Sequence, residues 1–321
     1  MGRFGQTLER ALEAPKNIPA GDLAGMLACG DPGFEGELFA AAREVKTRCG
    51  KTEVLPRGLI ECSNVCAKDC RYCGIRKSNA ALPRYRLDEA QAAACVDEAR
   101  RRGYPAVAFQ AGEVESEANT AYYERLLEGC GGLEVTLSLG EQEEDVYRRW
   151  REKGAMRYLL RIETSNPELY ARLHPAACSF GRRVNCLRIL KRLGYVTGTG
   201  VMIGLPGQTL GDLARDIVFF GEIGADMVGM GPWVPHPQTP LGAEPFGCGL
   251  TTPESRMSLA LRMIALVRLY LHGVNIVAAT ALEALDPQNG RARGIDAGAN
   301  VVMPTLTPPD FRSAYALYPG K

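Results

Sequence analysis

The stretch RGLIECSNVCAKDCRYCGIRK (57–77) joins a short apolar segment to four closely spaced cysteines. Its first part, RGLIEC (57–62), has the length and the aliphatic character of a buried strand. Amphipathic stretches of helical period, such as 87–103 and 252–273, lie between most of the strand-like segments of the chain. Strand and helix alternating eight times predict an α/β fold, a complete (β/α)8 TIM-type barrel. The other seven strand-like segments are 105–110 (PAVAFQ), 134–139 (EVTLSL), 157–163 (RYLLRIE), 196–203 (VTGTGVMI), 225–230 (ADMVGM), 274–279 (VNIVAA) and 299–303 (ANVVM).

An open doubly wound sheet is the alternative to the barrel, but it rarely needs eight regular units in a row. The chain before residue 56 reads instead as two or three helices. We therefore expect an N-terminal helical extension, residues 1–55, packed on a barrel formed by residues 56–321. Glycines that follow a periodic stretch and precede a strand indicate where the helices of the barrel end; they are Gly103, Gly154, Gly194, Gly224 and Gly273.

Charge and hydropathy limit the classes of partner. The 321 residues include 38 basic and 37 acidic ones, a net charge of +1. A nucleic-acid or anionic-membrane partner usually leaves a larger basic footprint than this. The N-terminus carries Glu9, Arg10 and Glu13 where a signal peptide needs an apolar run. The most apolar helix, 259–271, contains two arginines and is too short to span a bilayer. We expect a soluble cytoplasmic protein with no nucleic-acid or membrane partner.

Three of the eleven cysteines stand apart as candidate metal ligands. Without an export signal a disulfide framework is not expected, and most of the cysteines lie singly in apolar helical segments. Cys66, Cys70 and Cys73 form C-x3-C-x2-C on one loop after the first predicted strand. Catalytic groups of such barrels gather at that end of the strands. Three thiolates on a 4Fe–4S cluster would leave one iron open to a small molecule.

Zinc is the competing hypothesis for these cysteines. A structural zinc site closes with four Cys or His ligands, commonly as two separated pairs. No distant C-x2-C pair is present, and the three histidines are isolated in the sequence. Cys62 offers a fourth thiol, but inside a strand a buried thiol is the simpler interpretation. A zinc-stabilised barrel or a non-catalytic iron–sulfur carrier remains an alternative here.

The C-x3-C-x2-C spacing, with Tyr72 just before the third cysteine, resembles the signature of the radical S-adenosylmethionine (SAM) superfamily. The resemblance implies that the open iron is chelated by SAM, and that an electron from the cluster cleaves SAM to give a 5′-deoxyadenosyl radical. The protein would then supply orientation and a dry cavity. The segment QAGE (110–113), after the second strand, resembles the superfamily segment that receives the amino group of SAM.

Polar side chains are expected inside the barrel. Along the third strand, Thr136 and Ser138 alternate with apolar residues that should face the helices. Arg161 and Glu163 share a face of the fourth strand, where an unpaired charge would cost several kcal/mol. They therefore need each other or a charged ligand, and a purely structural ion pair is the alternative. The Pro/Gly-rich segment 231–247 is too rigid for a linker and is well placed as a lid.

Longer strings resemble one family within the superfamily, the FeFe-hydrogenase maturase HydE, a relative of biotin synthase and methylornithine synthase. The likeness runs along nearly the whole chain from about residue 56. The strings are SNVCAKDCRYCGIR (63–76), VTLSLGE (135–141), RYLLRIETSNPELYARLHP (157–175), NCLRILKRLGYVTGTGVMIGLPGQT (185–209), DMVGMGPWVPHPQTPL (226–241), GANVVMPTLTP (298–308) and YALYPGK (315–321).

The resemblance to the HydE family implies a role for each matching position. The three loop cysteines would hold the SAM-binding cluster, with Tyr72 beside the adenine. The other cofactor-binding residues would be Gln110, Gly112, Glu113, Thr136, Ser138, Glu163 and Arg183. The substrate cavity would be formed by Arg161, Thr280, Met303, Tyr315 and Tyr318.

The family's activity is one radical step in building the diiron subcluster of the hydrogenase active site. It implies attack of the adenosyl radical on the sulfur of a cysteine-bound iron carbonyl cyanide made by HydG, with the product passing towards the scaffold HydF. A reductant such as ferredoxin or flavodoxin would supply the electron. The alternative on the same scaffold is a methylornithine-synthase-like amino-acid mutase. Arg161 could bind the carboxylate of its substrate, but no evident acid serves an ammonium group.

Three features depart from the family pattern. Cys62 stands where many relatives carry an aromatic residue, and Ala279 replaces one of two adjacent threonines. The sequence ends at LYPGK, where relatives commonly continue and sometimes carry cysteines for an accessory cluster. With none of those here, and no further clustered cysteines for a biotin-synthase-like second cluster, we predict one cluster per chain.

Overall fold

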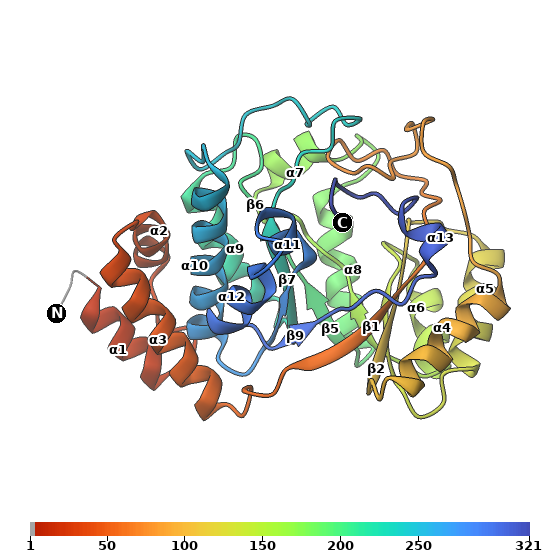
Figure 1. Cartoon of the computed structure of the whole chain (residues 1–321), viewed down its shortest axis with the longest axis horizontal. Coiled ribbons are helices and arrows are strands. Elements are labelled where there is room, and N and C mark those ends of the chain that lie inside the picture. Colours follow the sequence, from red (N-terminus) through yellow and green to blue (C-terminus); the bar gives the residue numbers. More distant parts are fainter. Residues whose placement is uncertain (1–3) are drawn as a thin grey trace.

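The predicted strands pair in parallel into a closed ring. A computed structural model describes residues 4–321 (Figure 1). The ladder runs β5-β4-β3-β2-β1-β9-β8-β7, and pairing of β5 with β7 closes it, while β6 pairs with β7 beside the ring. The predicted (β/α)8 TIM-type barrel is therefore confirmed. The strands are β1 (Leu55–Ser63), β2 (Ala106–Ala111), β3 (Glu134–Ser138), β4 (Ala155–Leu159), β5 (Val196–Thr199), β6 (Met202–Ile203), β7 (Met227–Pro232), β8 (Asn275–Ala278) and β9 (Val301–Val302).

Helices surround the barrel, and most of them begin at side chains that accept the free N–H groups of a first turn. Thr209 and Asp212 form a capping box that opens α9, and Asp88 with Gln91 forms another at α4. The helices of the barrel are α4 (Glu89–Arg101), α5 (Glu117–Glu128), α6 (Glu144–Glu152), α7 (Pro167–Leu173), α8 (Phe180–Arg192), α9 (Leu210–Glu222), α10 (Pro253–Leu271), α11 (Thr280–Leu285), α12 (Gly290–Asp296) and α13 (Pro309–Arg312).

Several boundaries differ from the prediction, and the predicted strand 196–203 is divided into β5 and β6. Strand β4 ends at Leu159, so Arg161 and Glu163 lie beyond the strand and not within it. Beyond Leu159 the pairing is no longer regular, although the N–H of Glu163 still donates to the carbonyl of Gly200 at 3.0 Å, and Glu163 adopts φ +65°. Four of the five predicted helix-ending glycines have positive φ, but after α10 it is His272 (φ +48°), not Gly273, that turns the chain.

The first three helices pack against one side of the barrel. They are α1 (Gly5–Glu13), α2 (Ala20–Ala28) and α3 (Pro32–Arg48), and they lie beside α9 and α10 (Figure 1). Arg262, in α10, ties this side together because its guanidinium donates to the carbonyl of Cys29 and to the carboxylate of Glu35. The division into residues 1–55 and 56–321 stays a prediction.

The second arginine of α10 joins three elements at the amino ends of the strands. Arg268 is fully buried. Its guanidinium donates to the carbonyls of Val274 and Gly298 at 2.7 and 3.0 Å and to Oδ1 of Asn300 at 3.1 Å. Asn300 in turn accepts from the backbone N–H of Ile276 in β8. One side chain thus fastens α10 to the starts of β8 and β9.

None of the helices between residues 4 and 321 combines the length and hydropathy needed to cross a bilayer.

Replacing Arg268 should weaken the whole barrel. In Arg268→Met the carbonyls of Val274 and Gly298 lose their donor while staying buried, and each such loss costs about 1–3 kcal/mol. We expect the free energy of unfolding to fall by about 3 kcal/mol or more, measured by urea denaturation. The control is Arg148→Met, which breaks an exposed pair with Glu144 and should cost less than about 1 kcal/mol. Equal effects of the two variants would contradict this role.

Candidate active site

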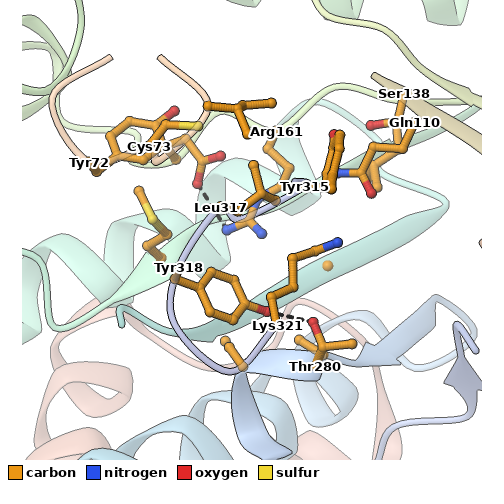
Figure 2. A pocket seen from close by; sticks show the side chains of 18 of the residues that line it. Tyr72, Cys73, Gln110, Ser138, Arg161, Thr280, Tyr315, Leu317, Tyr318 and Lys321 are labelled. Atoms are coloured by element: carbon orange, nitrogen blue, oxygen red, sulfur yellow. Dashed lines mark hydrogen bonds and ion pairs between the residues drawn. The ribbon is translucent and has the colours of Figure 1, made fainter. Parts of the chain in front are cut away.

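Every site residue predicted from the sequence lines one cavity at the carboxyl ends of the strands. Its volume is about 300 Å³. Its floor is apolar, because Leu159, Val277 and Met303 pack together there with other luminal side chains. Figure 2 shows the labelled side chains pointing into this space from the barrel and from the C-terminal segment. The predicted residues are Cys66, Tyr72, Cys70, Cys73, Gln110, Gly112, Glu113, Thr136, Ser138, Arg161, Glu163, Arg183, Thr280, Met303, Tyr315 and Tyr318.

The backbone at the end of β2 holds the cysteine loop closely. A Cβ atom on Gly112 would lie 2.2 Å from the carbonyl oxygen of Val65 and 2.7 Å from Cβ of Cys66. The N–H of Glu113 donates to Sγ of Cys66 at 3.3 Å, and its carbonyl accepts from Ala67 at 2.8 Å. Glycine at position 112 therefore serves contact with the loop as well as any approach of a ligand.

Two other segments, at the end of α7 and near the C-terminus, hydrogen-bond to the backbone of the cysteine loop. The N–H of Arg71 donates to the carbonyl of Leu173 at 2.8 Å, at the end of α7. The N–H of Gly74 donates to the carbonyl of Leu317 at 3.0 Å, in the C-terminal segment. A Cβ on Gly74 would lie 2.0 Å from the carbonyl oxygen of Ala316. The loop is thus fixed by main-chain contacts on three sides.

The three loop thiols share the cavity but not one ligand position. Between residues 4 and 321, no three His, Cys, Asp or Glu side chains are arranged as the ligands of a single metal ion would be. An iron–sulfur cube takes each thiolate at a different iron, so spread thiols suit a cube better than a zinc ion. Burial raises the pKa of Cys73 to about 12 and that of Cys70 well above its usual value. A bound cation is what would hold them as thiolates.

Cys62 plays no part in this set. It is fully buried in β1, and its thiol donates to the carbonyl of Ile60 at 3.6 Å. It does not line the cavity. The prediction of a buried strand thiol is confirmed, and it removes the fourth ligand on which a zinc site would depend.

Buried ion pairs surround the part of the cavity next to the cysteine loop. Glu113 pairs with Lys68 at 3.0 Å, and the guanidinium of Arg183 lies 3.9 Å away. Arg183 also donates to Glu141 at 2.6 Å and to the carbonyl of Arg161 at 2.5 Å. Burial raises the pKa of Glu113, and these two cations oppose that effect. Lys68 and Glu141 were not singled out from the sequence, although Glu141 directly follows the polar third strand.

Arg161 and Glu163 form the ion pair that the sequence predicted. Nη2 of Arg161 donates to Oε2 of Glu163 at 2.9 Å. The buried Nε of Arg161 has no hydrogen-bond partner among residues 4–321. Because the pair uses only part of the guanidinium, Arg161 keeps a donor for an anionic ligand.

A neutral histidine positions Tyr72. His174 stacks on Tyr170 with 3.9 Å between the ring centroids, and its Nδ1 lies 2.9 Å from the carbonyl oxygen of Tyr170. Nδ1 must therefore carry the proton, and Nε2 accepts from the hydroxyl of Tyr72 at 3.3 Å. Burial lowers the pKa of His174 to about 3, so the ring stays uncharged at neutral pH. The sequence alone did not distinguish His174 from the other two histidines, all of which are isolated along the chain.

Segments beyond the ring complete the walls. Trp233 and Val234 line the cavity from the Pro/Gly-rich segment 231–247, at the place predicted for a lid. On the opposite side the hydroxyls of Thr280 and Tyr318 are hydrogen-bonded at 2.5 Å. Tyr315, Leu317, Tyr318 and Lys321 enter the cavity from the C-terminal segment (Figure 2).

Adding one methyl group at position 112 should displace the cysteine loop. Gly112→Ala would force Cβ into a backbone carbonyl that cannot move without the loop. We expect a loss of about 2 kcal/mol in the free energy of unfolding and a lower iron content after anaerobic reconstitution. In the control, Gly131→Ala, no heavy atom lies within 4 Å of the added Cβ. Iron content and stability equal to those of Gly131→Ala would refute the contact.

The chain is similar to known proteins in sequence and in fold. A family model described as the radical SAM superfamily matches residues 60–220. The FeFe-hydrogenase maturase subunit HydE of Thermotoga maritima is 44% identical over 296 residues, covering 92% of this chain and 82% of that protein. The 3-methylornithine synthase of Methanosarcina acetivorans is 26% identical, covering 95% and 83%. A solved methylornithine synthase structure superposes with a TM-score of 0.82 at 25% identity, covering 95% and 87%.

These matches settle the class of cofactor. Membership of the superfamily implies a 4Fe–4S cluster and SAM, which suits three spread thiols in a buried polar cavity. The chain is a radical SAM enzyme, and it belongs to the HydE family of FeFe-hydrogenase maturases.

Proposed function

We propose that this radical SAM enzyme carries out the HydE step in maturation of the FeFe-hydrogenase active site. Its substrate would be a cysteine-bound iron carbonyl cyanide, and radical attack would fall on the sulfur of that complex. One observation supports the proposal most. The cysteine loop and the half-free guanidinium of Arg161 open into the same small cavity, so a cofactor and an anionic substrate can meet there.

The cofactor half of the cavity is assigned to the cysteine loop and the ends of β2 and β3. Cys66, Cys70 and Cys73 would hold the cluster, and the cluster with SAM supplies a 5′-deoxyadenosyl radical when reduced. Tyr72, held by His174, would lie beside the adenine. The remaining SAM contacts are assigned to Gln110, Gly112, Glu113, Thr136, Ser138, Glu163 and Arg183, all of which line the cavity.

The substrate half is assigned to side chains on the other part of the ring. Arg161 follows β4, Thr280 begins α11, and Met303 follows β9. Tyr315 and Tyr318 come from the C-terminal segment. Arg161 would bind the anionic part of the substrate with the donors that Glu163 does not use. The apolar floor and the lid residue Trp233 would exclude water from the radical.

The proposal includes three kinds of partner. A HydG-like maturase would supply the substrate, and a HydF-like scaffold would receive the product. A cytoplasmic reductant such as ferredoxin or flavodoxin would deliver the electron. The alternative, a methylornithine-synthase-like mutase, rests on the 26% identical relative and the similar solved structure.

Variants at the cysteines test the radical chemistry. Wild-type protein, reconstituted anaerobically with iron and sulfide and reduced with dithionite, should release 5′-deoxyadenosine from SAM. Cys70→Ser removes one of three ligands and should abolish this release and most of the iron binding. Cys62→Ala, a buried thiol outside the cavity, should keep both. A wild-type protein that holds one cluster yet yields no deoxyadenosine would overturn the enzymatic role.

Maturation is tested by supplying the proposed partners. Apo-hydrogenase incubated with this protein and HydG- and HydF-like maturases should become active. Arg161→Met removes a charge-assisted contact with the anionic substrate, so the rate of activation should fall about tenfold or more. The exposed Arg125→Met should stay within about twofold of wild type. No activation by the wild type, with 3-methylornithine formed from free amino acids, would favour the mutase.

A further inference from the structure

Positive charge is concentrated in the segment that carries the three cysteines. Residues 64–86 contain six basic side chains and one acidic one, a net charge of +5, whereas the whole chain carries +1. The rest of the protein is therefore acidic, with a net charge of −4. Figure 1 shows the segment between β1 and α4 at the outside of the barrel. The charged side chains of this segment are Lys68, Asp69, Arg71, Arg76, Lys77, Arg84 and Arg86.

Some of these charges are neutralised by acids nearby, and others are not. Arg76 pairs with Asp69 at 2.6 Å, and Arg71 pairs with Glu244 at 3.4 Å. Lys77 and Arg84 are both exposed, and within residues 4–321 no carboxylate lies at ion-pair distance from either of them. Two cations next to the cysteines thus face solvent without an acidic partner.

Main-chain pairing fixes Arg84 beside the cysteine loop. After the loop the chain turns back along β1, where Arg86 forms an antiparallel bridge with Ser63. The guanidinium of Arg84 donates to carbonyls on both sides of the cysteines, that of Asn64 at 2.7 Å and that of Ile75 at 2.8 Å. All of its acceptors are carbonyl oxygens, which orient the guanidinium but do not cancel its charge.

An exposed apolar side chain adjoins these cations. Val65, which is 39% exposed, directly precedes Cys66 and follows Asn64, whose carbonyl accepts from Arg84. Arg84 also donates to the carbonyl of Lys77 at 3.4 Å. Val65, Lys77 and Arg84 thus lie on one stretch of surface, which we call the loop face. An apolar residue among charged ones is a usual composition for a surface that binds another protein.

We propose that the loop face binds an acidic protein that carries one electron, and that Lys77 and Arg84 attract and orient this carrier. The inference rests on the proposed function, because each cleavage of SAM consumes one electron. In the transfer the carrier is oxidised by one electron, the cluster that the three cysteines would hold is reduced by one, and no atom moves. Since Val65 is bonded directly to Cys66, a protein bound here lies next to the cluster ligands.

The charge of the chain favours an acidic carrier at this place over any other. Opposite charge on two surfaces speeds their encounter and fixes their orientation, whereas like charge suppresses binding. The loop face lies in the segment of net charge +5, and the remaining chain, at −4, repels an acidic protein. The same carrier would therefore be directed to the one part of the surface from which the electron has the shortest way to go.

The test uses reduced flavodoxin of acidic isoelectric point as the probe. Deoxyadenosine release by the cluster-loaded protein with SAM is measured against flavodoxin concentration. Lys77→Glu should raise the KM for flavodoxin about tenfold or more, because it places like charges opposite each other. With dithionite, a small reductant that needs no docking surface, its rate should stay within about twofold of wild type. Lys153→Glu, the same charge change at a surface pair with Glu128, is the control and should keep the wild-type KM.

Binding without turnover gives a second measurement. Titration of oxidised flavodoxin into the cluster-loaded wild type, followed by calorimetry, should show an affinity that falls about tenfold or more between about 50 and 500 mM salt. Equal KM values for Lys77→Glu and Lys153→Glu, or an affinity that salt does not change, would overturn the loop face as a docking surface. If Lys77→Glu also slows the dithionite reaction, the salt dependence of the wild type decides. No deoxyadenosine with either reductant would remove the proposed function, whereas calorimetry would still test the loop face.

Discussion

The close contact between Gly112 and the backbone of the cysteine loop is the constraint on which the site depends. The parallel ladder places β2 beside β1, and the first residues after both strands must then share very little space. Only a residue without a side chain allows the carbonyl of Val65 to lie where it does. Main-chain hydrogen bonds to Glu113, Leu173 and Leu317 complete the hold. The positions of the thiols are therefore set by backbone geometry, and the side chains between them are left to other tasks.

Charge neutralisation is the second organising feature of the cavity. Each buried charge is balanced by a residue from a different part of the ring or from the chain beyond it: Arg183 by Glu141, Glu113 by Lys68, and Glu61 by Lys321. Arg161 and Glu163 are the exception, since they are neighbours in the chain. Isolated buried charges are costly, so a charged ligand needs an opposite charge in the cavity, and an anionic one would find the donors of Arg161 that Glu163 leaves free.

The fold and most of the lining were predictable from the sequence because they follow local periodicity and short motifs. Alternation along the third strand placed Thr136 and Ser138 in the lumen, and the structure agrees. The end of β4 was not predictable, because the strand-like run of the sequence continues to Glu163 whereas the regular ladder ends at Leu159. After α10 it is His272 that turns the chain, and its Nε2 donates to the carbonyl of Ala11, 261 positions away, a contact that no local pattern shows. Glu61 could have been found by extending the alternation of Arg57 and Leu59, whereas Lys68 and Lys321 carry no local signal.

The C-terminal segment touches both halves of the cavity at once. The carbonyl of Leu317 accepts from the N–H of Gly74, directly after the third cysteine, and the hydroxyl of Tyr318 is hydrogen-bonded to that of Thr280, in the proposed substrate half. A displacement that frees one contact strains the other, because Leu317 and Tyr318 are consecutive residues, joined by one peptide unit. The loop that carries the three cysteines and the side of the cavity at Thr280 are therefore coupled through two adjacent residues of the C-terminal segment.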